Sequence, residues 1–124
     1  MKASTLLSMA LGSYLSGKTL GSVAIGTFDN GIDRKTYAAA WINEADQEQV
    51  CGNGATALPA VFGSGTDFCN HTFRLSNGYT YVLRGCGGGT LTLQHGDGSF
   101  NSVCRQAGDN FSGYCGIHRI WVCG

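Results

Sequence analysis

The chain has 124 residues, a length that fits one domain rather than two. Charged residues make up only 13% of the chain, and eight basic residues balance eight acidic ones. A net charge of zero excludes a basic nucleic-acid binder, because such proteins gain affinity by neutralising phosphates. It also argues against a disordered chain, since 43% hydrophobic residues without net charge should collapse into a core.

The first 24 residues are typical of a secretory signal peptide. Lys2 supplies one positive charge, and the apolar stretch 6–15 that follows is shorter than the roughly 20 residues that span a bilayer. Cleavage fits after Gly17 or, by the small-x-small rule, after Ala24. The alternative is an amphipathic first helix retained in the fold. No later segment is apolar enough to span a membrane, so we expect one soluble domain at 25–124.

Signals before the first cysteine are mixed. Residues 23–28 predict a strand, whereas 36–49 fit a strand or a short helix, since the alanines at 38–40 favour a helix and Trp41 fits either. Arg34 and Lys35 form a possible processing site, and an exposed charged turn is the alternative. Pro59 interrupts an apolar run and indicates the end of a strand or a sheet edge.

The six cysteines all follow the proposed leader. An even number in the mature chain predicts three disulfides formed in an oxidising compartment. A zinc site is disfavoured, because there is no C-x-x-C pair and the histidines show no ligand spacing, so we expect no metal and no cofactor. The pairing stays open. The cysteines are Cys51, Cys69, Cys86, Cys104, Cys115 and Cys123.

The interval between Cys69 and Cys86 predicts a β-hairpin. Asn77-Gly78 separates the β-forming runs 72–75 and 79–83. A three-residue loop with Gly78 in a left-handed bulge would pair Leu75 with Tyr79 and place the apolar side chains on one face, whereas a two-residue loop would split them. We therefore predict the three-residue loop. The shared face would hold Phe73, Leu75, Tyr79, Tyr81 and Leu83.

The remaining chain predicts a second hairpin and a central strand. Residues 90–93 alternate Thr with Leu, 96–98 form a turn, and 99–103 return. The glycines at 87–89 indicate a flexible connector or a place of close backbone approach. A nucleotide-binding loop is disfavoured, since no helix pattern follows. Residues 117–122 are apolar on both faces, and Cys115 and Cys123 bracket them. The predicted fold class is mainly β: a small disulfide-stapled sandwich or barrel of antiparallel hairpins, with room for one short helix.

Candidate chemistry is sparse, and we expect no catalytic residues. His95 and His118 with an arginine (Arg84, Arg105 or Arg119) would suit ribonuclease-like acid–base catalysis; solvated or structural histidines are the alternative. Residues 62–65 fall short of a G-x-S-x-G motif. Asp97 and Asp109 lie in glycine-rich turns without a calcium-loop pattern. Carboxylates for glycoside hydrolysis would come from Glu44, Asp46, Glu48, Asp67, Asp97 and Asp109.

Two further surface features have binding interpretations. Four aromatic residues could stack on a carbohydrate, although such residues more often belong to a core: Trp41, Tyr79, Tyr81 and Trp121. Asn70-His71-Thr72 and Asn110-Phe111-Ser112 are N-glycosylation sequons, so Asn70 and Asn110 are candidate glycan sites.

Three runs, FRLSNGYTY at 73–81, GCGG at 85–88 and GDGSFNSVC at 96–104, resemble small secreted cysteine-rich proteins of filamentous fungi. The resemblance covers roughly 69–124 and leaves 18–50 outside it. It implies an extracellular effector-like protein that acts on a host or a competing microbe, a virulence role without shared catalytic residues.

We therefore expect a secreted, monomeric, non-enzymatic binding protein whose partner is a host or microbial protein or glycan, not a nucleic acid or a membrane. Loops around Asn77, Gly78, His95 and Asp97 are the predicted contact surface. The alternatives are an antimicrobial or toxin-like protein, a small hydrolase such as a ribonuclease, and a protease inhibitor.

Overall fold

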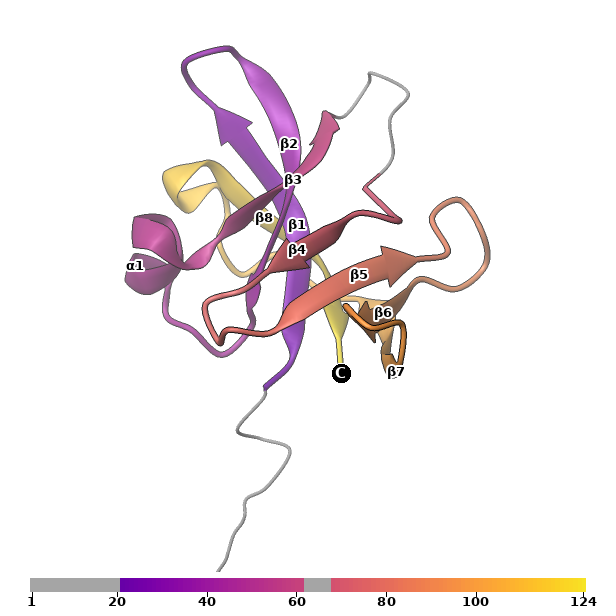
Figure 1. Cartoon of the computed structure of the whole chain (residues 1–124). Coiled ribbons are helices and arrows are strands. Elements are labelled where there is room, and N and C mark those ends of the chain that lie inside the picture. The colour runs from indigo at the N-terminus through magenta and orange to yellow at the C-terminus, as the bar shows by residue number, and fades with distance from the viewer. Residues whose placement is uncertain (1–20, 62–67) are drawn as a thin grey trace, which may run out of the picture.

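The computed structural model describes residues 21–61 and 68–124, and its strands form one antiparallel sheet (Figure 1). The order is β3-β2-β1-β8-β7-β6-β5-β4. The predicted mainly β class is confirmed. Residues 1–20 of the predicted leader, which was placed at 1–24, and the partial motif at 62–65 lie outside the described residues. The strands are β1 Val23–Asn30, β2 Lys35–Ile42, β3 Thr56–Val61, β4 Thr72–Arg74, β5 Thr80–Arg84, β6 Thr92–His95, β7 Phe100–Gln106 and β8 Ile117–Cys123.

The sheet curls until its two end strands meet. The Thr56 side chain at the start of β3 donates a hydrogen bond from Oγ1 to the carbonyl oxygen of Arg74 in β4, at 2.8 Å. The result is a nearly closed barrel, which shortens the exposed sheet edges that favour aggregation. Pro59 lies in β3, which is at one end of the strand order. Of the two predictions for Pro59, the sheet edge is therefore confirmed.

The segment that was ambiguous between strand and helix contains both. Residues 35–42 form β2, in which Ala38, Ala39 and Ala40 are buried, because burial between neighbouring strands outweighs the helix preference of alanine. A short helix, α1 (Gln47–Gln49), follows and continues as a π-helical turn, η2 (Val50–Gly54). The Asp46 carboxylate caps α1 by accepting a hydrogen bond from the Gln49 N–H at 2.8 Å.

The hairpin of β4 and β5 has the predicted register. Phe73 pairs with Tyr81, the Leu75 N–H donates to the Tyr79 carbonyl at 3.1 Å, and Gly78 has a φ of 87°. The three-residue loop with a left-handed glycine is therefore confirmed. Of the five side chains predicted to share a face, four are buried, whereas Tyr79 is 47% exposed because it precedes β5 at the end of the hairpin.

The second predicted hairpin joins β6 to β7, and the predicted central strand is β8. The His95 N–H donates to the Ser99 carbonyl and the Gly98 N–H to the His95 carbonyl, both at 2.8 Å. β8 lies between β1 and β7, which confirms its central position. The connector between the two hairpins, 85–91, is a turn without helix.

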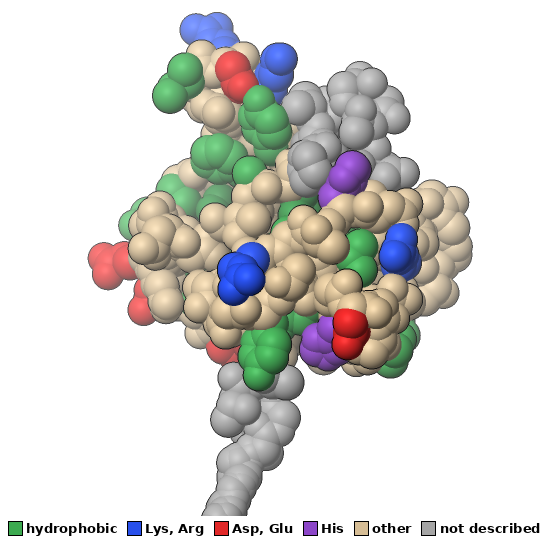
Figure 2. Space-filling view, in the orientation of Figure 1, with side chains coloured by type: hydrophobic (Ala, Val, Ile, Leu, Met, Phe, Trp, Pro, Cys, Tyr) green, Lys and Arg blue, Asp and Glu red, His purple; other side chains and the backbone are tan. Residues whose placement is uncertain are grey.

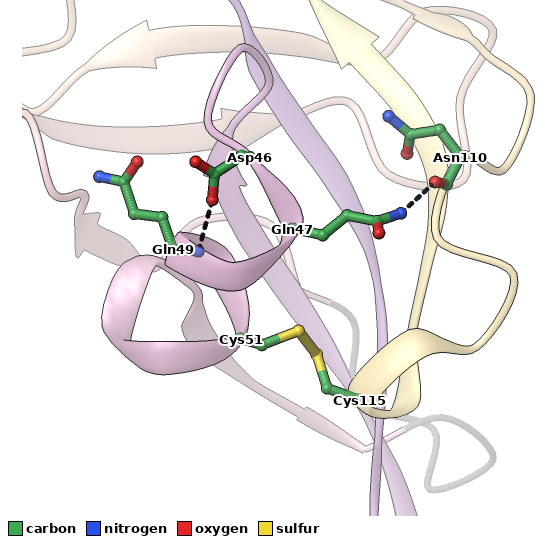
Figure 3. Close-up of a disulfide and its surroundings, with 6 residues drawn as sticks. All are labelled: Asp46, Gln47, Gln49, Cys51, Asn110 and Cys115. Carbon is green, nitrogen blue, oxygen red and sulfur yellow. Dashed lines mark hydrogen bonds between the residues drawn. A yellow bond between two sulfur atoms is a disulfide. The ribbon is translucent and has the colours of Figure 1, made fainter.

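Three disulfides hold the sheet, as predicted, and the fold decides their pairing. Cys104 and Cys123 are directly opposite each other in β7 and β8. Cys69–Cys86 ties the start of the described segment 68–124 to the end of β5. Cys51–Cys115 joins η2 to η3 (Tyr114–Gly116), the 3-10 turn before β8 (Figure 3). Cys115 and Cys123 therefore anchor both ends of β8.

The core has two parts, one on each side of β1 and β2. The larger part fills the barrel and includes Val23, Ile25 and Leu83. The smaller part lies on the opposite face of these strands, where Trp41 and Phe111 meet edge to face with ring centroids 5.3 Å apart. Val50 of η2 and Phe111 of the segment before β8 cover this second face, so the alternating side chains of β1 are buried on both sides.

Candidate functional site

Two of the hairpin turns lie side by side and form the surface that the sequence analysis predicted for binding. β5 and β6 pair with Tyr81 opposite His95, and the Gly96 N–H donates to the Thr80 carbonyl at 2.8 Å. The turns before β5 and after β6 are therefore neighbours. We call this surface the turn face; it consists of Asn77, Gly78, Tyr79, His95, Asp97, Phe100 and Asn101.

Contacts through a buried tyrosine connect the two turns. Asn77 donates from Nδ2 to the Tyr81 hydroxyl at 3.0 Å, and its Oδ1 accepts from the Tyr79 N–H at 3.0 Å. The Tyr81 ring stacks on the His95 ring, with centroids 5.8 Å apart and an interplanar angle of 26°. Tyr81 is only 2% exposed, so a core residue fixes one side chain from each turn.

The β6–β7 turn carries its own polar network. Asp97 accepts hydrogen bonds from the Ser99 hydroxyl at 2.7 Å and the Ser99 N–H at 2.9 Å. These bonds hold the pKa of Asp97 below its ordinary value, so the turn carries a negative charge at neutral pH. His95 Nε2 lies within hydrogen-bond distance of Asn101 Nδ2, at 3.2 Å. The turn is therefore ordered by its side chains before any partner binds.

Aromatic side chains project from the turn face. Tyr79, which directly precedes β5, is 47% exposed, and Phe100, the first residue of β7, is 63% exposed. Aromatic residues supply much of the energy of protein interfaces, since they bury a large area with few rotatable bonds. The turn face therefore has the composition of a contact surface.

The four aromatic residues considered for carbohydrate stacking do not form one platform. Trp41 is fully buried in the smaller core and Tyr81 is buried beneath the turn face. Tyr79 is exposed on the turn face. Trp121 lies in β8, where its ring is 5.8 Å from that of Phe68. The sequence pattern could not separate core aromatics from surface ones, because it does not show which strands are covered on both faces, as β2 is at Trp41.

The two histidines proposed for ribonuclease-like chemistry are not brought together. His95 ends β6 beside the first residues of β7, whereas His118 lies in β8 beyond the point where Gln106, the last residue of β7, pairs with Trp121. They therefore lie toward opposite ends of β7. Arg84 bonds to Asn70 and Gln94, and Arg105 bonds to the Gly124 carbonyl. This arrangement supplies no acid–base pair from these histidines.

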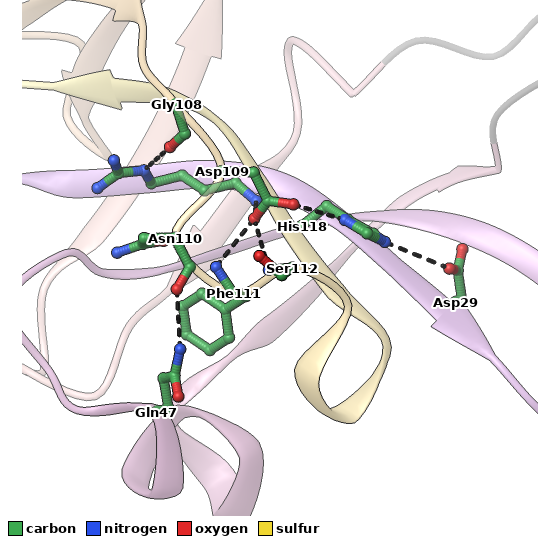
Figure 4. Close-up of polar contacts among 9 residues, drawn as sticks. Asp29, Gln47, Gly108, Asp109, Asn110, Phe111, Ser112 and His118 are labelled. Atoms are coloured by element: carbon green, nitrogen blue, oxygen red, sulfur yellow. Dashed lines mark hydrogen bonds and ion pairs between the residues drawn. The ribbon is translucent and has the colours of Figure 1, made fainter.

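His118 instead belongs to a polar network centred on Asp109 (Figure 4). Its Nδ1 donates to the Asp109 carboxylate at 2.7 Å, and its Nε2 lies 4.0 Å from a carboxylate oxygen of Asp29 in β1. Asp109 also accepts from the backbone N–H groups of Phe111, Ser112 and Arg119 at 2.9 to 3.1 Å. These bonds, that from His118 foremost, hold the pKa of Asp109 well below its ordinary value.

The Asp109 network fastens the loop before β8 to the sheet. Arg119 adds bonds from Nε to the Gly108 carbonyl at 2.8 Å and from Nη1 to Asn43 Oδ1 at 2.9 Å. The Asn110 carbonyl accepts from Gln47 Nε2 at 2.8 Å, which links the same loop to α1 (Figures 3 and 4). From the sequence, Asp109 was a candidate only for a calcium ligand or a catalytic carboxylate. Its role as the centre of this network could not be predicted, because the partners become neighbours only when the loop folds against β8.

The other carboxylates are dispersed. Glu44 accepts from the Ser22 N–H and hydroxyl, while Asp97 and Asp109 serve separate turns, so they do not form the pair considered for calcium. Within 21–61 and 68–124, no group of three or more His, Cys, Asp or Glu residues is arranged to hold a metal ion. Asp67 lies outside the described residues.

Both sequons are at the surface. Asn70 and Asn110 are exposed, and the Asn70 Oδ1 accepts a hydrogen bond from Arg84 Nη1 at 2.6 Å. Arg34 and Lys35 lie at the exposed turn between β1 and β2.

No protein-family model matches the chain, and no curated protein or solved structure matches it either.

Proposed function

We propose that the protein is a secreted, non-enzymatic binding protein, effector-like in a fungal–host setting, which contacts a host or microbial protein or glycan as a monomer. Three disulfides are typical of extracellular proteins. In the described part of the chain, no helix has the length and apolar character needed to cross a bilayer. N-glycans at Asn70 and Asn110 belong to the same proposal, which peptide mass mapping before and after glycosidase treatment tests.

The observation that carries this proposal is the coupling of both turns through Tyr81. Because the Asn77 bond and the His95 stacking order the turns in the free protein, a partner would lose little conformational freedom on binding. The ordered turns present Tyr79 and Phe100 outward. A rigid scaffold that displays aromatic residues between ordered polar groups suits recognition better than catalysis.

The experiment is affinity capture from host extracellular and microbial extracts with the oxidised protein and two variants. Tyr79→Ser combined with Phe100→Ser should reduce recovery of the specific partner at least tenfold. Tyr114→Ser is the matched control, because Tyr114 is 49% exposed and lies in η3, away from the turn face. Equal recovery with the double variant and the control would show that the turn face is not the contact surface.

A second candidate function, protease inhibition, is favoured by the hairpin of β1 and β2. Ile32 at its tip is 96% exposed, and Figure 2 shows the charged side chains gathered around this projection. Asn30 accepts from the Ile32 N–H at 2.9 Å, and Asp33 accepts from the Lys35 N–H at 2.9 Å and from the Tyr37 hydroxyl. The tip is thus an ordered exposed loop.

Titration of representative proteases with the wild-type protein and with Ile32→Ser tests protease inhibition. Inhibition that is lost in the variant supports this function, and no inhibition by the wild-type protein excludes it.

A further inference from the structure

A groove lies at the far end of the β5–β6 hairpin from the turn face. It has a volume of about 390 Å³, and the glycine-rich connection 85–89 forms one side of it. The residues that line the rest of it include Phe68, Leu91, Gln106 and Trp121. We call it the glycine groove. Its volume falls in the range of small-ligand sites, which is roughly 300–1,000 Å³.

We propose that the glycine groove binds a short segment of a neutral carbohydrate. The described residues that line it include no Asp, Glu, Lys, Arg or His. Phosphate, sulfate and carboxylate groups are normally recognised by cations, and the described lining supplies no cation for them. Its lining combines the aromatic and aliphatic side chains of Phe68, Leu91 and Trp121 with the Gln106 amide and the glycine-rich connection 85–89. This mixture fits a sugar, whose C–H faces are apolar and whose hydroxyl groups need donors and acceptors.

Trp121 is held in place as a stacking surface would need to be. Its side chain is half-buried, packs against the larger core and contacts Phe68 at a tilt of 44°. Trp121 lies in β8 and Gln106 lies directly opposite it in β7. The disulfide Cys104–Cys123 joins the same two strands. An indole fixed beside an amide therefore requires little reordering when a ligand enters.

The glycines at 88 and 89 are not explained by the fold alone. Neither residue has the positive φ that makes glycine necessary, and a Cβ at Gly89 would have no atom within 4 Å. At Gly88 the nearest atom to a Cβ would be the Gly85 carbonyl oxygen at 3.4 Å, an ordinary contact. Because packing and backbone geometry tolerate side chains here, we infer that their absence keeps the side of the groove open to a ligand.

This site is separate from the turn face and does not depend on it, so the two proposals can fail independently. The test is calorimetric titration of the oxidised protein with soluble neutral hexasaccharides. These consist of N-acetylglucosamine, of β-1,4-linked glucose, of β-1,3-linked glucose and of β-1,4-linked xylose. An oligogalacturonate serves as the anionic probe. We expect at least one neutral hexasaccharide to bind and the anionic one not to bind. Trp41 is fully buried, so a ligand-induced change in tryptophan fluorescence would report Trp121.

The variants distinguish the groove from other surfaces. Gln106→Ala and Gly89→Leu should each weaken binding at least tenfold. Gly108→Leu is the matched control, since a Cβ at Gly108 also has no atom within 4 Å, and Tyr79→Ser tests the turn face. Both should bind as wild type does, and far-ultraviolet circular dichroism checks that all variants are folded. The proposal is overturned if no neutral hexasaccharide binds, if binding survives both groove variants, or if Tyr79→Ser abolishes it.

Discussion

His118 and Asp109, nine residues apart in the chain, are joined by a hydrogen bond of 2.7 Å from the imidazole Nδ1 to the carboxylate. The same carboxylate accepts three backbone N–H groups, so one charged side chain organises the whole turn that leads into β8. These bonds thus stabilise the glycine-containing loop that precedes β8.

Replacing Asp109 should therefore change stability in a pH-dependent way. The pKa of Asp109 is lowered in the folded protein from an ordinary 3.8, so its contribution is complete above that value and is lost as the pH falls below it. We expect Asp109→Asn to lower the free energy of unfolding at pH 6 by about 1 kcal/mol, a value reduced for solvent screening. The deficit should shrink as the pH falls below 3.8.

Urea denaturation between pH 2.5 and 7 measures this effect. Glu48→Gln on the exposed surface of α1 is a suitable control, since no side-chain hydrogen bond of Glu48 is seen in the described structure. A deficit that stays constant over the whole pH range would show that Asp109 acts by shape rather than by charge.

The three disulfides should contribute unequally. Cys51–Cys115 closes a loop of 64 residues, compared with 17 for Cys69–Cys86 and 19 for Cys104–Cys123. In the chain-entropy model, this predicts losses of about 4 kcal/mol for the long loop and about 3 kcal/mol for each short one. Paired Cys→Ala variants, compared by thermal and urea unfolding, test the order. If removal of Cys69–Cys86 is the most damaging, native contacts rather than loop length dominate.

Gly26 should tolerate no side chain, because the backbone of β8 occupies the space that a Cβ would need. A Cβ at this position would lie 1.8 Å from the His118 carbonyl oxygen, next to the register shift between Ile25 and Gly26. We expect Gly26→Ala to cost about 3 kcal/mol. Gly31→Ala, in the same hairpin but with no atom within 4 Å of a Cβ, should change stability by less than about 0.5 kcal/mol. Similar midpoints of thermal unfolding for both variants would contradict this reading.

The mature protein should begin at or before Ser22. Val23 and Ala24 are buried in β1, and Ser22 is bonded to Glu44 and, through its carbonyl, to the Asn43 N–H at 2.9 Å. Leader cleavage after Gly17 keeps these contacts, whereas cleavage after Ala24 would remove them. Intact-mass analysis of secreted material reports the N-terminus, and a folded protein that starts at Ile25 would refute the expectation.

Local chemistry made the hairpins predictable. In β4–β5, the position of Gly78 and the alternation of Phe73 and Leu75 select one loop length, because a shift by one residue would expose the apolar side chains. The central position of β8 followed from apolar residues on both of its faces. By contrast, the exposure of Tyr79 and the burial of Trp41 depend on which elements cover each face, and no local pattern records that.

The turn face and the glycine groove differ in how far the sequence could predict them. Asn77 and His95 were predicted as residues of candidate binding loops, but their link through Tyr81 appears only once β5 and β6 pair. The glycine groove combines the connection 85–89 with Trp121, a residue of the last strand. A site assembled from segments so distant in the chain has no signature of its own in the sequence.

The amino-acid sequence by itself determined the fold class, the two hairpins with their turns, and the presence of enough cysteines for three disulfides. These features depend on side-chain alternation and turn residues, which act over a few positions. The tertiary structure alone decided the order of the strands, the pairing of the cysteines and the partnership of Asp109 with His118. Those outcomes depend on how the sheet curls to bury both faces of β1 and β2, and that packing is a property of the whole chain.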